Sequence, residues 1–263
     1  MSSHKSYSFG NTVQFISDNF GVIFLVILFF VGGFFAGALW TENQAVKAGG
    51  SPTKEVADAN QQEVVKEENK LSKTNLQNYA YATNKNFDRN KFDKCLDNSQ
   101  FAEKIKNQSA QGSAAGITGT PGTIIVVDGQ PKEIISGALP IAQIKTVVDR
   151  YLTGNSEVDP KAAAALKASG FAPISEDDHL QGNKEAKIVL VEYSDFECPY
   201  CSGFHNTMNQ VIKEYGDQIA WVYRHYPLGF HPNAQLAAQA AECVAEVGGN
   251  EAFWRFADQA FAK

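Results

Sequence analysis

The chain has 263 residues, of which 44% are hydrophobic and 20% are charged, and its formal net charge is −6. This composition supplies enough apolar side chains for one or two globular domains and excludes a disordered protein. The acidic balance, together with the lack of any clustered run of Lys and Arg, excludes a protein that binds nucleic acid through its phosphates.

Residues 20–40, FGVIFLVILFFVGGFFAGALW, form an apolar run without an ionisable side chain. As a helix, a run of this length spans about 30 Å of hydrocarbon, so we predict an uncleaved transmembrane anchor in contact with membrane lipid. A cleaved signal peptide is the alternative, although its apolar region usually has about 7 to 15 residues. We expect residues 1–19 to be a short cytoplasmic amino terminus and the rest of this single-pass cell-membrane protein to be extracytoplasmic, where disulfides persist.

Composition divides the chain after the apolar run. Residues 41–69 are polar with almost no bulky apolar side chain, which is typical of a tether between membrane and domain. Residues 153–178 form a second connector, with room for one short Ala-rich helix. Two compact segments remain, 70–152 and 179–263, and neither repeats the other.

The segment 70–152 has the predicted order helices, strand, strand, helix. The Asp-Gly pair at residues 128 and 129 favours a tight hairpin turn between the two strands. The predicted helices cover Leu71–Tyr81, Arg89–Cys95 and Pro140–Leu152, and the predicted strands cover Thr123–Val127 and Glu133–Ser136.

The segment 179–263 begins with an apolar run, Ile188–Tyr193, that only Glu192 interrupts, which predicts a buried central strand. A helix follows from Cys198, with Pro199 at its first helical position, where the missing N–H costs nothing. A second strand is predicted over Ile219–Tyr226. Two helices then cover Ala234–Val247 and Glu251–Ala262.

The C-P-Y-C sequence places Cys198 at a helix start and Cys201 one turn further, on the apolar stripe of that helix. A thiol is nucleophilic only as thiolate, and the free N–H groups of a helix start stabilise that anion, so the pKa of Cys198 should fall. Cys201 should be shielded. One attacking and one resolving sulfur are what disulfide exchange requires. A zinc site and a structural loop closure are the alternatives, but zinc normally needs a second ligand pair.

Glu192 lies on the strand that leads to the cysteine pair, so its carboxylate can take the proton of Cys201. The alternative is a partly exposed residue at the strand end. His205, four residues after Cys201, suggests a metal site completed by His225 or His231. We expect no metal and no cofactor, because His205 is better explained as the rim of the helix and His231 as a cap before the Ala-rich helix.

Three spaced motifs, EYSDFECPYCSGFH, YPLGFHPNAQLAAQAAEC and GITGTPG, together resemble the DsbA-like thiol:disulfide oxidoreductases. C-P-Y-C alone also resembles glutaredoxin. The resemblance implies an α/β thioredoxin-like fold with an inserted helical lid. It implies that Cys198 is the exposed nucleophile, Cys201 the resolving thiol and Glu192 the buried acid.

The resemblance also implies that Thr120 precedes a cis-proline, Pro121, which faces the cysteines and offers backbone hydrogen bonds to a substrate peptide. From the residues alone, Pro121 could simply be a trans turn residue among glycines, because only about 5 to 6% of X–Pro bonds are cis; the family resemblance overturns that expectation. We expect Thr120, Pro121, Pro199 and Tyr200 to contact the substrate.

The order of the two segments departs from the family. Residues 70–152 resemble the family's carboxyl-terminal half, and residues 179–263 resemble its amino-terminal half. A circularly permuted single domain is the preferred explanation, ahead of halves exchanged between chains and of a fragment of a tandem protein. The connector 153–178 reaches roughly 85 Å when extended, so closure within one chain is geometrically easy.

Two further cysteines, Cys95 and Cys243, lie on predicted lid helices, one in each segment. We hypothesise a structural disulfide that joins the two halves. Two buried free thiols are the alternative.

The cysteine pair and the apolar run 20–40 together predict a membrane-anchored oxidase that introduces disulfides into exported cysteine-containing proteins. The resemblance implies a redox partner in the membrane. Tyr200 lacks an imidazole that would place positive charge beside Cys198, so we expect a milder oxidant than a protein with histidine there. A disulfide reductase, an isomerase, a cytochrome-maturation helper and a non-catalytic binding module remain the alternatives.

Overall fold

The computed structural model describes residues 69–155 and 160–262, which belong to one compact unit. The predicted anchor, residues 20–40, lies outside the described residues, as do the amino terminus before it and nearly all of the predicted tether. Within the described ranges, none of the helices combines the length and the apolar character that crossing a bilayer requires.

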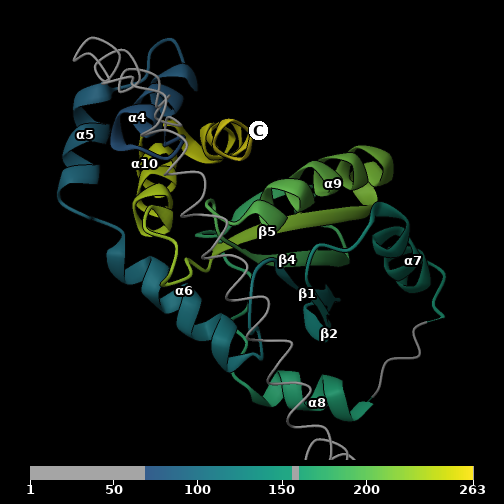
Figure 1. The fold of residues 1–263 in the computed structure, drawn as a ribbon. Helices are drawn as coiled ribbons and strands as arrows, with labels where there is room; N and C mark the ends of the chain where they lie inside the picture. The colour runs from purple at the N-terminus through teal and green to yellow at the C-terminus, as the bar shows by residue number, and fades with distance from the viewer. Residues whose placement is uncertain (1–68, 156–159, 263) are drawn as a thin grey trace, which may run out of the picture. The chain divides into compact units, whose positions relative to one another are not determined.

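A five-stranded sheet forms the centre of the unit, with the strand order β2-β1-β4-β5-β3 (Figure 1). The pair β4 and β5 is parallel, and the other neighbouring pairs are antiparallel. Every residue of β4 and β5 is buried; the apolar run predicts this for β4, whereas β5 is predicted only as a second, alternating strand. The strands are β1 (Gly122–Val127), β2 (Gln130–Ser136), β3 (His179–Gly182), β4 (Ile188–Ser194) and β5 (Ile219–His225).

The pairing of β1 with β4 joins the two halves of the chain. Its register sets Gly122 opposite Tyr193 and Val127 opposite Ile188. The start of β1 therefore lies beside the end of β4, and the loop before β1 reaches the turn that follows β4. The chain thus brings its GITGTPG and CPYC motifs to the same edge of one sheet, although the first precedes the second by about 80 residues.

Helices cover both faces of the sheet. On one face lie α7 (Ile141–Leu152) and α9 (Pro199–Tyr215), and on the other lies α8 (Pro160–Ala168), within the segment predicted as a connector (Figure 1). Side chains alternate between the faces along each strand. Leu190 and Trp221 belong to the core under α9, whereas Val191 and Val222 belong to a second core that includes Leu166 of α8.

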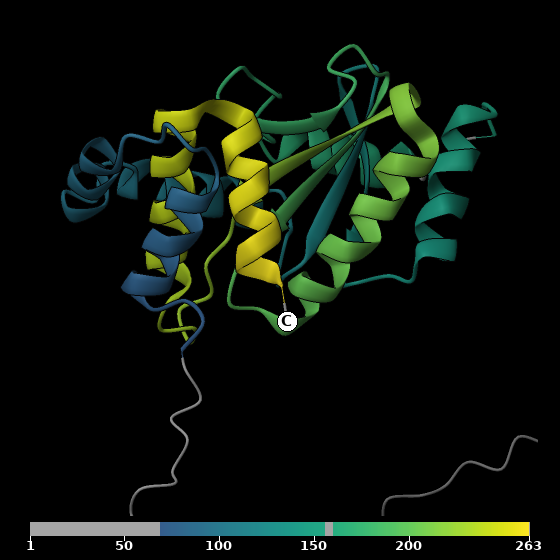
Figure 2. The same cartoon turned by 90° about the horizontal axis from the view of Figure 1, so that it is seen from above.

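Four helices form a lid at one side of the sheet: α4 (Lys73–Ala82), α5 (Arg89–Asp97), α6 (Ala102–Ala114) and α10 (Ala234–Phe261). The last of these bends at Gly249, whose φ of 75° belongs to the left-handed region that glycine adopts readily. The bend separates the two helices that the sequence predicts there. Figure 2 shows the final part of α10 returning toward the start of α9.

A disulfide joins Cys95 of α5 to Cys243 of α10, across 148 residues of sequence. The two lid helices that it links come from opposite sides of the segment 153–178. It therefore fastens the first half of the chain to the second through the lid.

Two elements differ from the sequence prediction. Helix α6 was not predicted, because the residues that it buries, Ile105, Gln108 and Gly112, do not form an apolar stripe. Strand β3 was not predicted either, because its four residues, HLQG, carry a single aliphatic side chain. Both elements form where the rest of the fold offers them a surface to cover or a strand edge to pair with.

Replacing both Cys95 and Cys243 with alanine should lower the free energy of unfolding by about 2 to 5 kcal/mol, because the unfolded chain regains the freedom that a closed loop removes. Urea unfolding of the oxidised parent and of the double variant measures this difference. Alkylation of the denatured parent without reductant should leave both cysteines unmodified in the intact mass. Equal unfolding midpoints, or alkylated Cys95 and Cys243, would contradict the prediction.

Candidate active site

Cys198 occupies the N-cap position of α9, and Pro199 is the first residue of that helix. Its backbone N–H donates to the Asp195 carbonyl at 3.1 Å, which closes the turn between β4 and α9. The side chain is 4% exposed, and its Sγ lies 3.5 Å from the carbonyl oxygen of Thr120. The structure thus places this sulfur at a helix start, between the turn after β4 and the loop before β1.

A hydrogen bond from the Cys201 thiol, assisted by the backbone N–H groups of Tyr200 and Cys201, lowers the pKa of Cys198 from 9.0 to about 5. These donors stabilise the thiolate against the opposing effect of burial. At neutral pH Cys198 is therefore a thiolate, the reactive form of the side chain.

Cys201 lies one turn into α9 and is completely buried. Burial raises its pKa far above the usual value, and its hydrogen bond to Cys198 and the charge of Glu192 raise it further. Cys201 is consequently a thiol when Cys198 is a thiolate. The pair therefore differs in protonation state. Cys198, expected to be the exposed nucleophile, is itself buried at 4% exposure, because the loop before β1 and the turn after β4 enclose its sulfur.

Glu192 is 1% exposed on β4, so it is not the partly exposed strand-end residue of the alternative interpretation. The Trp221 Nε1 group donates to its Oε2 atom at 2.9 Å. Burial, the largest cause, raises the pKa of Glu192 from 4.5 to about 7, and the charge of Cys198 adds to this increase. A carboxyl group with such a pKa both holds and releases a proton near neutral pH.

The bond between Thr120 and Pro121 is cis, and this dipeptide leads directly into β1. The Pro121 carbonyl accepts a hydrogen bond from Gly137 N–H, which ties the loop to the end of β2. Beside the loop lies a cavity of about 160 Å³, lined by Thr118, Thr120 and Pro121 among others.

On the other side of Cys198 a cavity of about 250 Å³ is lined by Pro199 together with residues 69–71 and 260–262. Tyr200, the next residue of α9, is 72% exposed. Of the four residues expected to contact a substrate, Thr120 lies beside the sulfur through its carbonyl, and Pro199 shares a cavity with Cys198.

Asp195 supports the site and was missed in the sequence. One of its carboxylate oxygens accepts from Glu197 N–H, and the other accepts from Leu228 N–H and interacts with His231 Nδ1 at 2.7 Å. This carboxylate holds the loop after β5 against the turn before Cys198. No spacing signal identifies its supporting role, because Leu228 and His231 lie 33 and 36 residues further along the chain.

The histidines of the alternative metal site have other partners. His205 Nε2 interacts with Asp258 at 2.7 Å, and His231 bonds to Asp195. Within residues 69–155 and 160–262, one group of three residues that could ligate a metal converges, namely His179, His225 and Glu242.

In that group both imidazoles contact Oε1 of Glu242, at 2.9 and 3.0 Å, and Lys104 Nζ contacts Oε2 at 2.7 Å. The carboxylate is thus already neutralised by the Lys104 ammonium, which disfavours a second cation beside it. We assign this buried cluster to anchoring the lid on the sheet.

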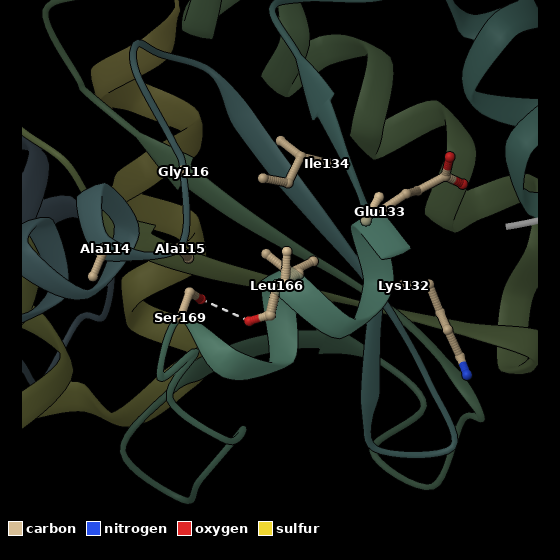
Figure 3. A pocket seen from close by; sticks show the side chains of 10 residues that line it. Ala114, Ala115, Gly116, Lys132, Glu133, Ile134, Leu166 and Ser169 are labelled. Atoms are coloured by element: carbon tan, nitrogen blue, oxygen red, sulfur yellow. Dashed lines mark hydrogen bonds between the residues drawn. The ribbon is translucent and has the colours of Figure 1, made fainter. Parts of the chain in front are cut away.

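A larger cavity, of about 630 Å³, lies between the end of α6, β2 and α8 (Figure 3). Its lining is mostly small and apolar, with Ala114, Ile134 and Leu166, and Lys132 stands at its edge. The cavity contains no cysteine and lies against the α8 face of the sheet, so it is separate from the candidate active site.

Two family models match the chain, one on each side of the α8 segment. The model described as a DSBA-like thioredoxin domain matches residues 37–149, and the model described as thioredoxin matches residues 175–263. The chain is a DsbA-like thioredoxin-fold protein. This confirms the family resemblance, and the mixed sheet with helices on both faces is the thioredoxin-like α/β fold that the resemblance implies.

Curated relatives of this DsbA-like protein match only in part. Over 105 residues it is 44% identical to the Na(+)/H(+) antiporter NhaA 3 of Salinispora tropica, which is 37% of the chain and 16% of the antiporter. Over 106 residues it is 43% identical to NhaA 1 of Mycolicibacterium vanbaalenii, covering 40% of the chain and 16% of the relative. The chain thus spans about one-sixth of the length of these proteins. Antiport is the activity in the names of those relatives.

The reduced DsbA-like protein should show a thiolate absorbance at 240 nm that appears with a midpoint near pH 5 and is absent from Cys198→Ala. Because this folded pKa lies below the unfolded value of about 8.5, the reduced form gains stability as pH rises from 5 to 8.5, and loses that contribution below pH 5. Unfolding of reduced parent and Cys198→Ala across this range measures the gain. A midpoint near 8.5 would contradict the stabilised thiolate.

Proposed function

We propose that this DsbA-like protein is an extracytoplasmic thiol:disulfide oxidoreductase that oxidises cysteine pairs in exported proteins through a Cys198–Cys201 disulfide. The observation that carries the proposal is the difference between the two sulfurs. Cys198, at the start of α9, has a pKa of about 5 and lies beside the Thr120 carbonyl, whereas Cys201 is completely buried with a raised pKa. Such a difference gives each sulfur one role in exchange.

In the oxidising direction, a client thiolate attacks Cys198 Sγ, and the electron pair of the broken S–S bond goes to Cys201. Glu192, with its pKa of about 7, supplies the proton that Cys201 takes up. A second client thiolate then attacks the client sulfur of the mixed disulfide. Cys198 leaves as a stabilised thiolate, because a thiol of low pKa is a good leaving group. The client has gained a disulfide, and the protein has gained two electrons.

The loop before β1 is the proposed binding site for the client backbone. Thr120 and Pro121 line a cavity beside this loop, the Thr120 carbonyl lies 3.5 Å from Cys198 Sγ, and Pro199 lines a second cavity together with Cys198. An extended peptide that pairs with the backbone of this loop would bring its cysteine toward Cys198 Sγ, which lies beside the Thr120 carbonyl. Main-chain pairing of this kind gives affinity with little dependence on sequence, which suits an enzyme with many clients.

We also propose that residues 20–40 anchor the protein in the cell membrane and that an oxidising membrane protein returns Cys198 and Cys201 to the disulfide. The anchor is supported by the apolar run, and the oxidising compartment by the Cys95–Cys243 disulfide. The closeness of the Thr120 carbonyl to Cys198 within a single chain favours a circularly permuted domain over exchanged halves.

Mixing the oxidised full chain with a peptide that carries two thiols should convert the peptide to its disulfide, one mole for each mole of protein. Cys198→Ala should abolish this reaction, and Cys95→Ala with Cys243→Ala should retain it when folded. Equilibration in glutathione buffers then gives the potential. A value near −270 mV, typical of thioredoxin, would favour a reductase and contradict the oxidase proposal.

Tyr200→His should make the protein a stronger oxidant, because an imidazolium beside Cys198 stabilises the thiolate of the reduced form. We expect about a tenfold change in the equilibrium constant with glutathione, which corresponds to roughly 30 mV. Tyr200→Phe is the matched control and should leave the constant nearly unchanged. Equal constants for the histidine and phenylalanine variants would show that residue 200 does not influence the thiolate.

A further inference from the structure

The indole of Trp221 holds one oxygen of the Glu192 carboxyl. Trp221 on β5 is paired in register with Leu190 of β4, which lies two residues before Glu192, so the three side chains project to the α9 face of the sheet. Trp221 Nε1 donates to Glu192 Oε2 at 2.9 Å. Trp221 is completely buried and Glu192 is 1% exposed, so water does not compete for this hydrogen bond.

The indole is fixed in place by rings from two helices. The ring centroid of Trp254 on α10 lies 4.5 Å from that of Trp221, and the centroid of His205 on α9 lies 5.2 Å from it. An indole N–H donates and cannot accept. Oε2 of Glu192 must therefore be the acceptor in both protonation states, which leaves Oε1 as the oxygen that carries the proton of the neutral carboxyl.

We infer that Trp221 is a positioning residue for the Glu192 carboxyl, with its Nε1–H keeping Oε2 as an acceptor so that the exchanged proton is carried on Oε1. The inference rests on the proposed function. When the Cys198–Cys201 bond breaks, its electron pair goes to Cys201 Sγ, and the proton on Oε1 passes to that sulfur. The carboxyl is left negative, and the indole N–H stabilises this charge. In the reverse direction the Cys201 proton returns to Oε1.

The bond from Trp221 keeps the charged form of Glu192 within reach at neutral pH. A buried carboxylate without a hydrogen-bond donor is strongly disfavoured. Burial raises the pKa of Glu192 to about 7, and the Trp221 hydrogen bond opposes this rise. Without the indole donor, Glu192 would keep its proton at neutral pH and would be a poorer acceptor for the proton of Cys201.

The other groups that face Glu192 supply no positive charge for this task. From α9, the titratable groups that interact with it are Cys198 and Cys201, and from β5 the titratable group is Tyr223. Its partner on β1 is Thr123, which does not titrate. Because none of these four side chains is a cation, a neutral donor such as the indole has to stabilise the carboxylate.

The first measurement follows the indole ¹⁵N–¹H resonances of the reduced full chain, labelled with ¹⁵N-tryptophan, from about pH 5 to 9. The chain has three tryptophans, so Trp40→Phe and Trp254→Phe assign the Trp221 resonance by elimination. That resonance should shift with a midpoint near pH 7, and the shift should be absent in Glu192→Gln. A shift that persists in Glu192→Gln would come from another neighbour, such as His205, and would overturn the inference.

The second measurement uses the reduced full chain and 5,5′-dithiobis(2-nitrobenzoate), with thionitrobenzoate release followed by stopped flow. Cys198 and Cys201 are the free cysteines, so two releases are expected. The first release reports attack by Cys198 on the reagent. The second reports attack by Cys201 on the resulting mixed disulfide, which requires loss of the Cys201 proton. Its pH profile should show an inflection near pH 7 from Glu192.

Trp221→Phe should raise this inflection by about one pH unit, a tenfold change in the proton affinity of Glu192, as expected for one lost hydrogen bond to a charged group. The first release should stay within about twofold of the parent. Trp254→Phe is the matched control. It also removes a buried indole N–H and keeps an aromatic ring, but that N–H makes no hydrogen bond within the described residues, so both releases should be unchanged.

Equal inflections in Trp221→Phe and Trp254→Phe would overturn the inference. A second release that is slower at every pH in Trp221→Phe, without a shifted inflection, would also overturn it, because the indole would then serve packing alone. A parent protein that gives no first release would overturn the proposed function, whereas the Trp221 resonance would still show whether its N–H is bound to Glu192. The two failures are therefore distinguishable.

Discussion

The pairing of β1 with β4 is the contact on which the candidate site depends. Six consecutive residue pairs, from Gly122 with Tyr193 to Val127 with Ile188, fix the two strands in one register. That register places the Thr120–Pro121 turn beside the residues that follow β4, where α9 begins. A shift by one residue would turn every side chain of β1 to the other face of the sheet and move the turn away from Cys198.

The two faces of the central strands explain why one side of the sheet is reactive. On the α8 side, alternate residues of β4 and β5 such as Val191 and Val222 build an apolar core. On the α9 side, Glu192, Ser194 and Tyr223 bring polar groups into an equally buried environment. Low polarity there raises the pKa of Glu192 and of Cys201, while Cys198, at the helix start, meets hydrogen-bond donors instead. The start of α9 thus holds Cys198 as a thiolate and Cys201, one turn further, as a thiol.

The lid is a second place where the two halves of the chain are joined, besides the pairing of β1 with β4. The Cys95–Cys243 disulfide lies one residue from Glu242, whose carboxylate joins His179 and His225 of the sheet to Lys104 of α6. Removing one partner from a buried charged cluster of this kind is strongly destabilising, because the remaining charge is left without compensation. The disulfide at Cys243 therefore links two lid helices, and the ionic cluster at the adjacent Glu242 links the lid to the sheet.

The sequence by itself determined the local elements whose signals are contained in a few neighbouring residues. The run Ile188–Tyr193 is strand β4, the Asp-Gly turn at residues 128 and 129 connects β1 and β2, and Pro199 is the first residue of α9. The spacing of Cys198 and Cys201 also predicts one sulfur at the helix start and one a turn further in, although the exposure expected for Cys198 is not found. These features depend on backbone geometry and helix periodicity, which act over a single turn or a single strand.

Only the tertiary structure decided which distant residues became neighbours. The burial of Glu192, its bond from Trp221, the hydroxyls of Ser194 and Tyr223 beside it, and the support of Asp195 for the loop after β5 all arise from contacts between separate strands and loops. The helix α6 and the strand β3 likewise depend on surfaces that other segments provide. No local pattern encodes such contacts, because the register of the sheet is set by the packing of the whole core rather than by the residues of any one strand.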